Sequence, residues 1–193
     1  MKNSQLPGAV CVGIVMLLAS VSASASIIYN LNRTIGAGTV TGFIETDGTI
    51  GVLAGANITD WVLTLTAPNL RGGTSDQIAF SSATVSSVIG SALSASATAL
   101  TFDFSSSDNS YLYLQGNSSN YYGLETATGN LAVGTAAESM GRDDRFPNPT
   151  YTEFVSRSGL VDIAQAVVPV PPAVWLFGSG LLGLTGIAKR KAA

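Results

Sequence analysis

Between residues 26 and 168, apolar and polar residues alternate in short runs with a period of two, which is typical of half-buried β-strands. Clusters of Gly, Asn, Asp, Ser and Pro separate these runs and indicate turns. Short strands with frequent turns predict an all-β domain, built as an antiparallel β-sandwich or jelly roll. The expected strands are residues 26–33, 40–45, 49–53, 58–66, 100–104 and 111–115, with weaker patterns at 121–125, 131–133 and 161–168.

Two stretches of this region carry more local signals. Asp47-Gly48 lies between β-branched runs, which predicts a tight hairpin that joins residues 40–45 to residues 49–53. Residues 82–98 are rich in Ser and Ala, and they fit either a short helix or a flat sheet edge.

The pattern changes completely near the C-terminus, where no charged residue occurs from Ala173 to Ala188. As an α-helix this stretch would be about 24 Å long, somewhat shorter than a hydrocarbon core of about 30 Å. We expect a transmembrane helix over 173–188, with Trp175 as an interfacial aromatic near one end. The alternative is a helix or hairpin buried in a soluble core.

The residues within and after this helix indicate its packing and its orientation. Ser179, Gly183 and Gly186 would share one small-residue face that suits contact with another helix. The basic tail 189–191 follows the helix, and the positive-inside rule places this end in the cytoplasm and the β-domain across the membrane. The tail consists of Lys189, Arg190 and Lys191.

A proline cluster precedes the helix, and it consists of Pro169, Val170, Pro171 and Pro172. Together with the apolar segment and the basic tail, it resembles the PEP-CTERM sorting signal of Gram-negative bacteria. Pro-Val-Pro stands here in place of the Pro-Glu-Pro that gives the family its name. The resemblance implies that a membrane enzyme, an exosortase, recognises residues 167–193 and cleaves near the prolines. Residues 46–65 resemble, more loosely, the start of the exported domains in that family.

The N-terminus has the features of a secretory signal peptide. Lys2 is followed by an apolar stretch over residues 9–21 and by the small residues Ala23 and Ala25. We predict cleavage between Ala25 and Ser26 after passage through the Sec translocon, which divides the chain into a signal peptide (1–25), a β-rich domain (26–166) and the sorting segment (167–193). The alternative is an uncleaved N-terminal anchor.

Composition restricts the chemistry that the domain can perform. The chain has no histidine, and its one cysteine, Cys11, lies in the predicted signal peptide. The mature chain therefore lacks the usual ligands of zinc, haem and iron–sulfur centres and the histidine of common catalytic pairs. Residues 26–168 carry five arginines, no lysine and twelve acids, a net charge of −7, which disfavours nucleic acid. We predict no cofactor and no enzymatic activity.

Some acidic and amide side chains have the oxygens that Ca²⁺ prefers, although their spacing matches no known calcium loop. The default interpretation is that they are solvated loop residues. The candidates are Asp103, Asp108, Asn109, Asp143 and Asp144.

Four tyrosines offer a different candidate site. Tyr111, Tyr113, Tyr121 and Tyr122 would stack on sugars if their rings faced solvent, whereas burial of the rings would exclude this role. The function expected from the sequence is that of an exported cell-surface or extracellular-matrix protein. Its precursor is anchored in the inner membrane with a periplasmic domain, and exopolysaccharide is a candidate partner. The alternative is a permanently anchored periplasmic carbohydrate-binding module.

Overall fold

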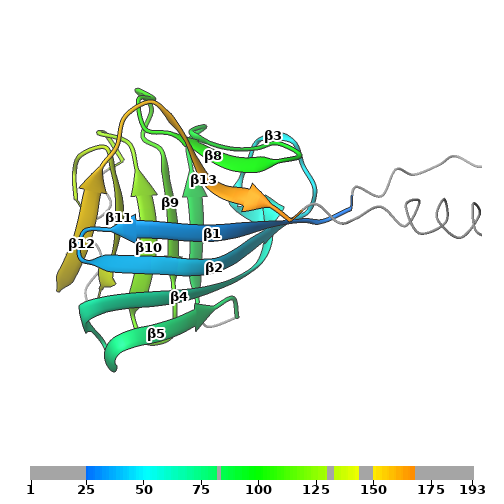
Figure 1. The fold of residues 1–193 in the computed structure, drawn as a ribbon. Coiled ribbons are helices and arrows are strands. Elements are labelled where there is room, and N and C mark those ends of the chain that lie inside the picture. The colour runs from blue at the N-terminus through cyan, green and yellow to red at the C-terminus, as the bar shows by residue number, and fades with distance from the viewer. Residues whose placement is uncertain (1–24, 82–83, 130–132, 144–149, 168–193) are drawn as a thin grey trace, which may run out of the picture.

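The structure is a computed structural model that describes residues 25–81, 84–129, 133–143 and 150–167. Across these residues the chain forms thirteen strands and one 3-10 turn, η1 (Gly55–Asn57). The strands belong to two antiparallel sheets, one of eight strands and one of five (Figure 1). The prediction of an all-β, antiparallel domain is therefore confirmed.

The order of strands in the larger sheet differs from their order in the chain, since β13 lies between β8 and β1. In spatial order the larger sheet contains β3 (Gly51–Val52), β7 (Leu93–Ala95), β8 (Ala99–Asp103), β13 (Leu160–Ala166), β1 (Ile27–Ile35), β2 (Gly38–Thr46), β4 (Ile58–Leu70) and β5 (Gly73–Ala79). The smaller sheet contains β12 (Tyr151–Ser156), β11 (Ala137–Arg142), β10 (Asn120–Glu125), β9 (Tyr111–Gln115) and β6 (Val85–Ile89).

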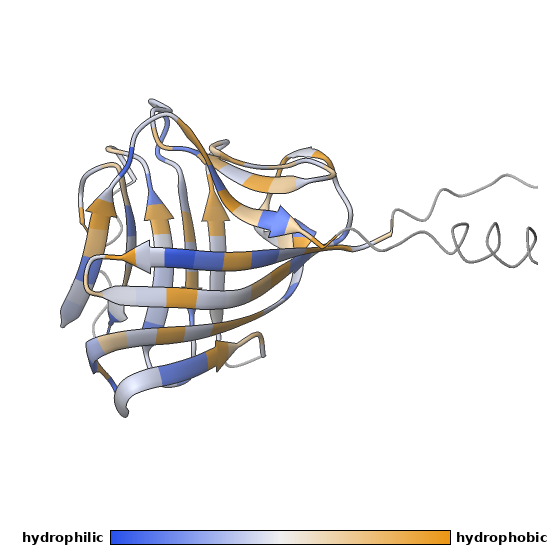
Figure 2. Ribbon diagram, viewed as in Figure 1, coloured by the Kyte–Doolittle hydropathy of each residue, from blue (hydrophilic) through white to orange (hydrophobic). Residues whose placement is uncertain are grey.

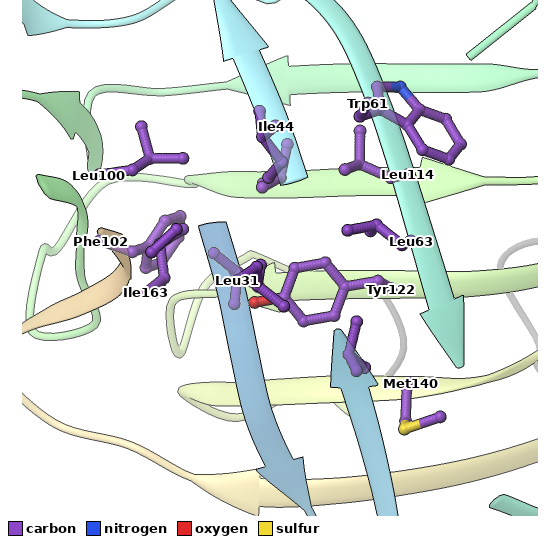
Figure 3. Close-up of a cluster of buried hydrophobic side chains, with 14 of the residues drawn as sticks. Leu31, Ile44, Trp61, Leu63, Leu100, Phe102, Leu114, Tyr122, Met140 and Ile163 are labelled. Carbon is purple, nitrogen blue, oxygen red and sulfur yellow. The ribbon is translucent and has the colours of Figure 1, made fainter. Parts of the chain in front are cut away.

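The two sheets pack face to face over one hydrophobic core, and their strands cross rather than run side by side (Figure 1). The alternation in the sequence produces this core because successive side chains of a strand point to opposite faces. In β4, for example, Trp61, Leu63 and Leu65 are buried. Figure 3 shows side chains of both sheets meeting, with Trp61 and Leu63 from β4 near Leu114 from β9 and Tyr122 from β10.

The prediction of a hairpin at Asp47-Gly48 is wrong. Gly51 and Val52 form β3, which pairs with β7 at the far edge of the sheet and not with β2. Asp47 holds a loop instead, since its carboxylate accepts hydrogen bonds from the Thr49 amide at 2.9 Å and from Asn57 Nδ2 at 3.0 Å.

A hairpin that the sequence did not predict joins β1 to β2 through Gly36 and Ala37. Gly36 has a φ of 56°, in the left-handed region that favours glycine. Next to it, the Ala37 amide donates to the Glu153 carboxylate of β12 at 2.8 Å. This turn is therefore fixed by a contact with the smaller sheet.

Other differences concern strands that the sequence pattern left open. Within residues 82–98, the described part forms β6 and β7 and no helix. Strands β5, β11 and β12 were not expected from the pattern. Of the strand weakly predicted at residues 131–133, the structure describes only Val133, which lies outside any strand.

The first and last described strands begin and end beside each other. Tyr29 of β1 pairs with Ala166 of β13, and the Val167 amide donates to the Ile28 carbonyl at 2.8 Å (Figure 1). Ala25 and Ser26, the predicted cleavage residues, are both exposed. Ala23, the proline cluster, the predicted helix 173–188 and the basic tail lie outside the described residues. Among the described residues there is no apolar helix of the length needed to cross a bilayer.

Candidate functional site

The structure contradicts the idea of a solvent-facing row of tyrosines. Tyr113, Tyr121 and Tyr122 expose at most 3% of their surface, and Tyr111 is half-buried. Tyr122 points into the core between the sheets (Figure 3). Tyr113 and Tyr121 stack on each other with ring centroids 5.2 Å apart, and the Tyr113 hydroxyl donates to Asp143 Oδ2 at 2.9 Å. These rings stabilise the smaller sheet and offer no surface on which a sugar can stack.

Burial of these rings makes an alkaline titration a direct test of the arrangement. Desolvation raises the pKa of Tyr121 to about 12 and the pKa of Tyr113 and Tyr122 well above the ordinary value. A raised pKa stabilises the fold below the ordinary value of about 10, and this contribution is lost as the pH rises through the folded-state pKa.

We therefore expect the tyrosinate absorbance of these three residues to appear in one step, together with loss of the circular dichroism signal, and not near pH 10. Protein unfolded in urea, the control, should titrate near pH 10. A gradual titration near this pH with the fold intact would show that the rings face solvent.

The acidic candidates for calcium use their oxygens to hold loops. Asp108 accepts hydrogen bonds from the hydroxyls of Ser91, Ser106 and Ser110 at 2.5–2.7 Å and from the Ser91 amide at 2.9 Å. These bonds hold the pKa of Asp108 well below its usual range, and the bond from the Ser106 hydroxyl contributes most. Asp103 Oδ1 accepts similarly from Ser105, at 2.6 Å from the hydroxyl.

The remaining calcium candidates are not gathered into a cluster either. In its hydrogen-bonding orientation, the Asn109 amide donates to the carbonyls of Thr128 and Gly129. Asp143 bonds to Tyr113, and Asp144 lies outside the described residues. Across the described ranges, no three His, Cys, Asp or Glu side chains converge as metal ligands would.

One buried charge cluster connects the two sheets. Glu138 of β11 is fully buried, and its carboxylate accepts hydrogen bonds from Arg33 of β1 at 2.8 Å through both oxygens. Arg157, which follows β12, donates to Oε2 at 2.8 and 3.1 Å, and the Tyr122 hydroxyl donates to Oε1 at 3.0 Å. With every carboxylate oxygen bonded, the cluster is a structural element with no group placed to react.

An open groove of about 500 Å³ lies where the β4–β5 turn approaches β11 and β12. Its lining is mixed and mainly polar, and it places no pair of carboxylates opposite each other. The lining residues are Pro68, Asn69, Leu70, Gly73, Thr74, Arg142, Thr150 and Tyr151.

A regular polar surface covers the outer face of the eight-stranded sheet, over β1, β2, β4 and β5, which lie side by side in Figure 2. Strand register places Thr, Ser, Asn and Gln side chains there in two rows of four. We call these eight residues the hydroxyl–amide face. The rows are Thr34–Thr39–Thr66–Ser75 and Asn32–Thr41–Thr64–Gln77.

Sequence reasoning missed this face because its members lie up to 45 residues apart, and only the register brings them together. Seven of the eight are exposed, and Thr64 is half-buried. The repeated pattern of one threonine, one apolar residue and one threonine at Thr39–Thr41 and Thr64–Thr66 was the available signal.

Comparison with known proteins adds no assignment. No protein-family model matches this chain, and neither a curated protein nor a solved structure matches it.

Proposed function

We propose that the chain is the precursor of an exported surface or matrix protein, held in the inner membrane by its C-terminal segment and released by an exosortase-type enzyme. The β-domain, a jelly-roll-like sandwich, is its structural or adhesive part and acts without catalysis. The observation that carries the proposal is the order of three signals after residue 167, which are the proline cluster, the apolar segment and the basic tail. Each of these signals has a physical role in retention or release.

The geometry of the domain is compatible with this order of events. Val167 is hydrogen-bonded to Ile28, so the sheet holds the chain up to two residues before Pro169. Proline resists both helix and ladder hydrogen bonding, which favours an extended segment open to a protease. Cleavage there would leave β13 and the rest of the sheet intact.

The placement of the two ends supports the same proposal. The predicted signal peptide precedes β1 and the sorting segment follows β13, and these two strands are neighbours. A precursor held by both ends in one membrane needs both ends on one side of its folded domain. The predicted cut before Ser26 would leave a single residue ahead of Ile27, the start of β1. In the precursor, the basic tail would lie in the cytoplasm.

Mass spectrometry of the mature protein tests the proposal. In cells with the exosortase we expect a C-terminus near residues 169–172, and in cells without it a chain that retains Lys189, Arg190 and Lys191. Replacing Pro169, Pro171 and Pro172 by alanine should block cleavage. The matched control is Pro68→Ala, an exposed proline of the domain, which should leave processing unchanged. An intact Lys-Arg-Lys end in cells that contain the enzyme would contradict the proposal.

A further inference from the structure

We propose that the hydroxyl–amide face binds a neutral polysaccharide that lies flat across β1, β2, β4 and β5. The inference deepens the proposed function and rests on it, since export brings the domain to the surface polysaccharides. It begins from the regularity of the face. Neighbouring strands lie about 4.8 Å apart, and side chains on one face repeat about every 6.7 Å along a strand. The two rows therefore form a lattice roughly 14 Å across.

Two charged residues that lie between members of the face along their strands turn away from it. Arg33 lies between Asn32 and Thr34 in the sequence, yet its guanidinium points inward to Glu138. Asp76 lies between Ser75 and Gln77, yet its carboxylate accepts a hydrogen bond from Asn120 at 2.7 Å and another from Ser118. The eight positions of the two rows are thus uncharged, whereas Glu45 of β2 and Asp60 of β4 form an acidic pair further along the same face, beyond Phe43 and Val62.

The lack of charge in the two rows favours a neutral ligand over an acidic one. An acidic polymer would find no cation on the face and would be repelled by the net negative charge of the domain. A neutral polymer meets neither obstacle. Its hydroxyl groups both donate and accept hydrogen bonds, as do the hydroxyls of Thr and Ser. The side-chain amides of Asn and Gln have an NH₂ group that donates and a carbonyl oxygen that accepts.

A third row beside the lattice provides the apolar contact that sugar rings need. Phe43 pairs with Val62, and Val62 pairs with Ala79, so these side chains form a strip along the edge of the second polar row. Phe43 and Val62 are half-buried and Ala79 is exposed. A sugar ring has C–H groups on its faces and hydroxyls around its rim. A polysaccharide over both features would place ring faces on the strip and hydroxyls on the polar rows.

A second protein molecule fits this face less well. Docking would bury eight polar side chains, and each group left without a partner would cost about 1–3 kcal/mol. Association through this face is therefore an outcome of the test and not the proposal.

Co-sedimentation of the purified full chain tests the inference, with a detergent that contains no sugar. The probes are insoluble cellulose and chitin as neutral polymers, and calcium-gelled alginate as the acidic one. We expect binding to at least one neutral polymer, little dependence on salt, and no binding to alginate. The double variant Thr41→Lys/Thr66→Lys should weaken that binding at least tenfold. The matched control, Thr98→Lys in the exposed β7–β8 turn, should bind as the wild type does.

Each other result would overturn the inference. These results are no binding to either neutral polymer, undiminished binding by the double variant, or a salt-sensitive preference for alginate. A concentration-dependent dimer that the double variant abolishes would assign the face to self-association. Circular dichroism and the melting temperature establish that the variants fold. Terminal mapping is a separate measurement, so failure of the sorting proposal and failure of sugar binding remain distinguishable.

Discussion

Replacing Glu138 by alanine is expected to destabilise the domain by about 3–5 kcal/mol, the usual cost of removing one partner from a buried ion pair. The carboxylate is fully buried and satisfies Arg33 from one sheet and Arg157 from the connection between the sheets. Its hydrogen bonds hold the pKa of Arg33 above the ordinary value. Without Glu138, both guanidinium groups would keep their charge with no counter-ion beside them.

Urea unfolding followed by circular dichroism measures this loss. Arg33→Ala and the double variant Arg33→Ala/Glu138→Ala complete a double-mutant cycle. Because the two side chains share two hydrogen bonds, we expect the double variant to lose clearly less stability than the sum of the single variants. Additive losses, equal within about 0.5 kcal/mol, would show that the ion pair contributes nothing to joining the sheets.

Gly42→Ala is also expected to destabilise the domain strongly, because it combines backbone strain with a collision. Gly42 lies within β2 at a φ of 139°. An added Cβ would lie 2.0 Å from the Val62 carbonyl oxygen and 3.0 Å from the Leu63 Cα, both on the backbone of β4. Strain at such a position costs about 1–3 kcal/mol, and overpacking costs a similar amount. We therefore expect a loss of roughly 2–6 kcal/mol.

Gly73→Ala is the matched control for this prediction. Gly73 has nearly the same φ, 137°, but a Cβ there would meet nothing within 4 Å. It should therefore lose only the strain contribution, about 1–3 kcal/mol. The difference between the two urea midpoints isolates the collision with β4. Equal losses for the two variants would show that β2 moves away from β4 at negligible cost.

The strands that the sequence predicted well are those whose burial follows the local alternation. Residues 58–66 were expected as a strand with Trp61, Leu63 and Leu65 on one face, and β4 buries these three side chains. Residues 26–33 were expected as an apolar strand, and β1 (Ile27–Ile35) buries Tyr29, Leu31 and Ile35. In such strands the pattern of side chains alone decides which face meets the core.

One of the strands that were missed, β11, depends on partners far away in the chain. In β11 a glutamate occupies a core position, which the hydrophobic pattern interprets as solvent-facing. Glu138 is buried there only because Arg33, 105 residues earlier, and Arg157 supply its hydrogen bonds. The prediction of a hairpin at Asp47-Gly48 failed for a related reason. Its local chemistry suits a hairpin, but pairing with β7 decides where β3 lies.

The candidate site, too, could be predicted only in part from the sequence. The alternation of Tyr and Leu in β9 correctly predicted two faces, but both faces are buried, and no local pattern reveals what covers the outer one. The polar residues of the hydroxyl–amide face were visible in the sequence, whereas the register that aligns them on four strands was not.

The position of β13 has a consequence for synthesis of the chain. This strand fills the place between β8 and β1, so the larger sheet remains in two pieces until residues 160–166 have been made. Contacts between Tyr29 and Ala166 span almost the whole domain, and such distant pairings form slowly. The nascent chain therefore cannot complete the larger sheet before β13 has been synthesised. If the chain is exported as proposed, this delay would help it to pass through a narrow channel before it folds.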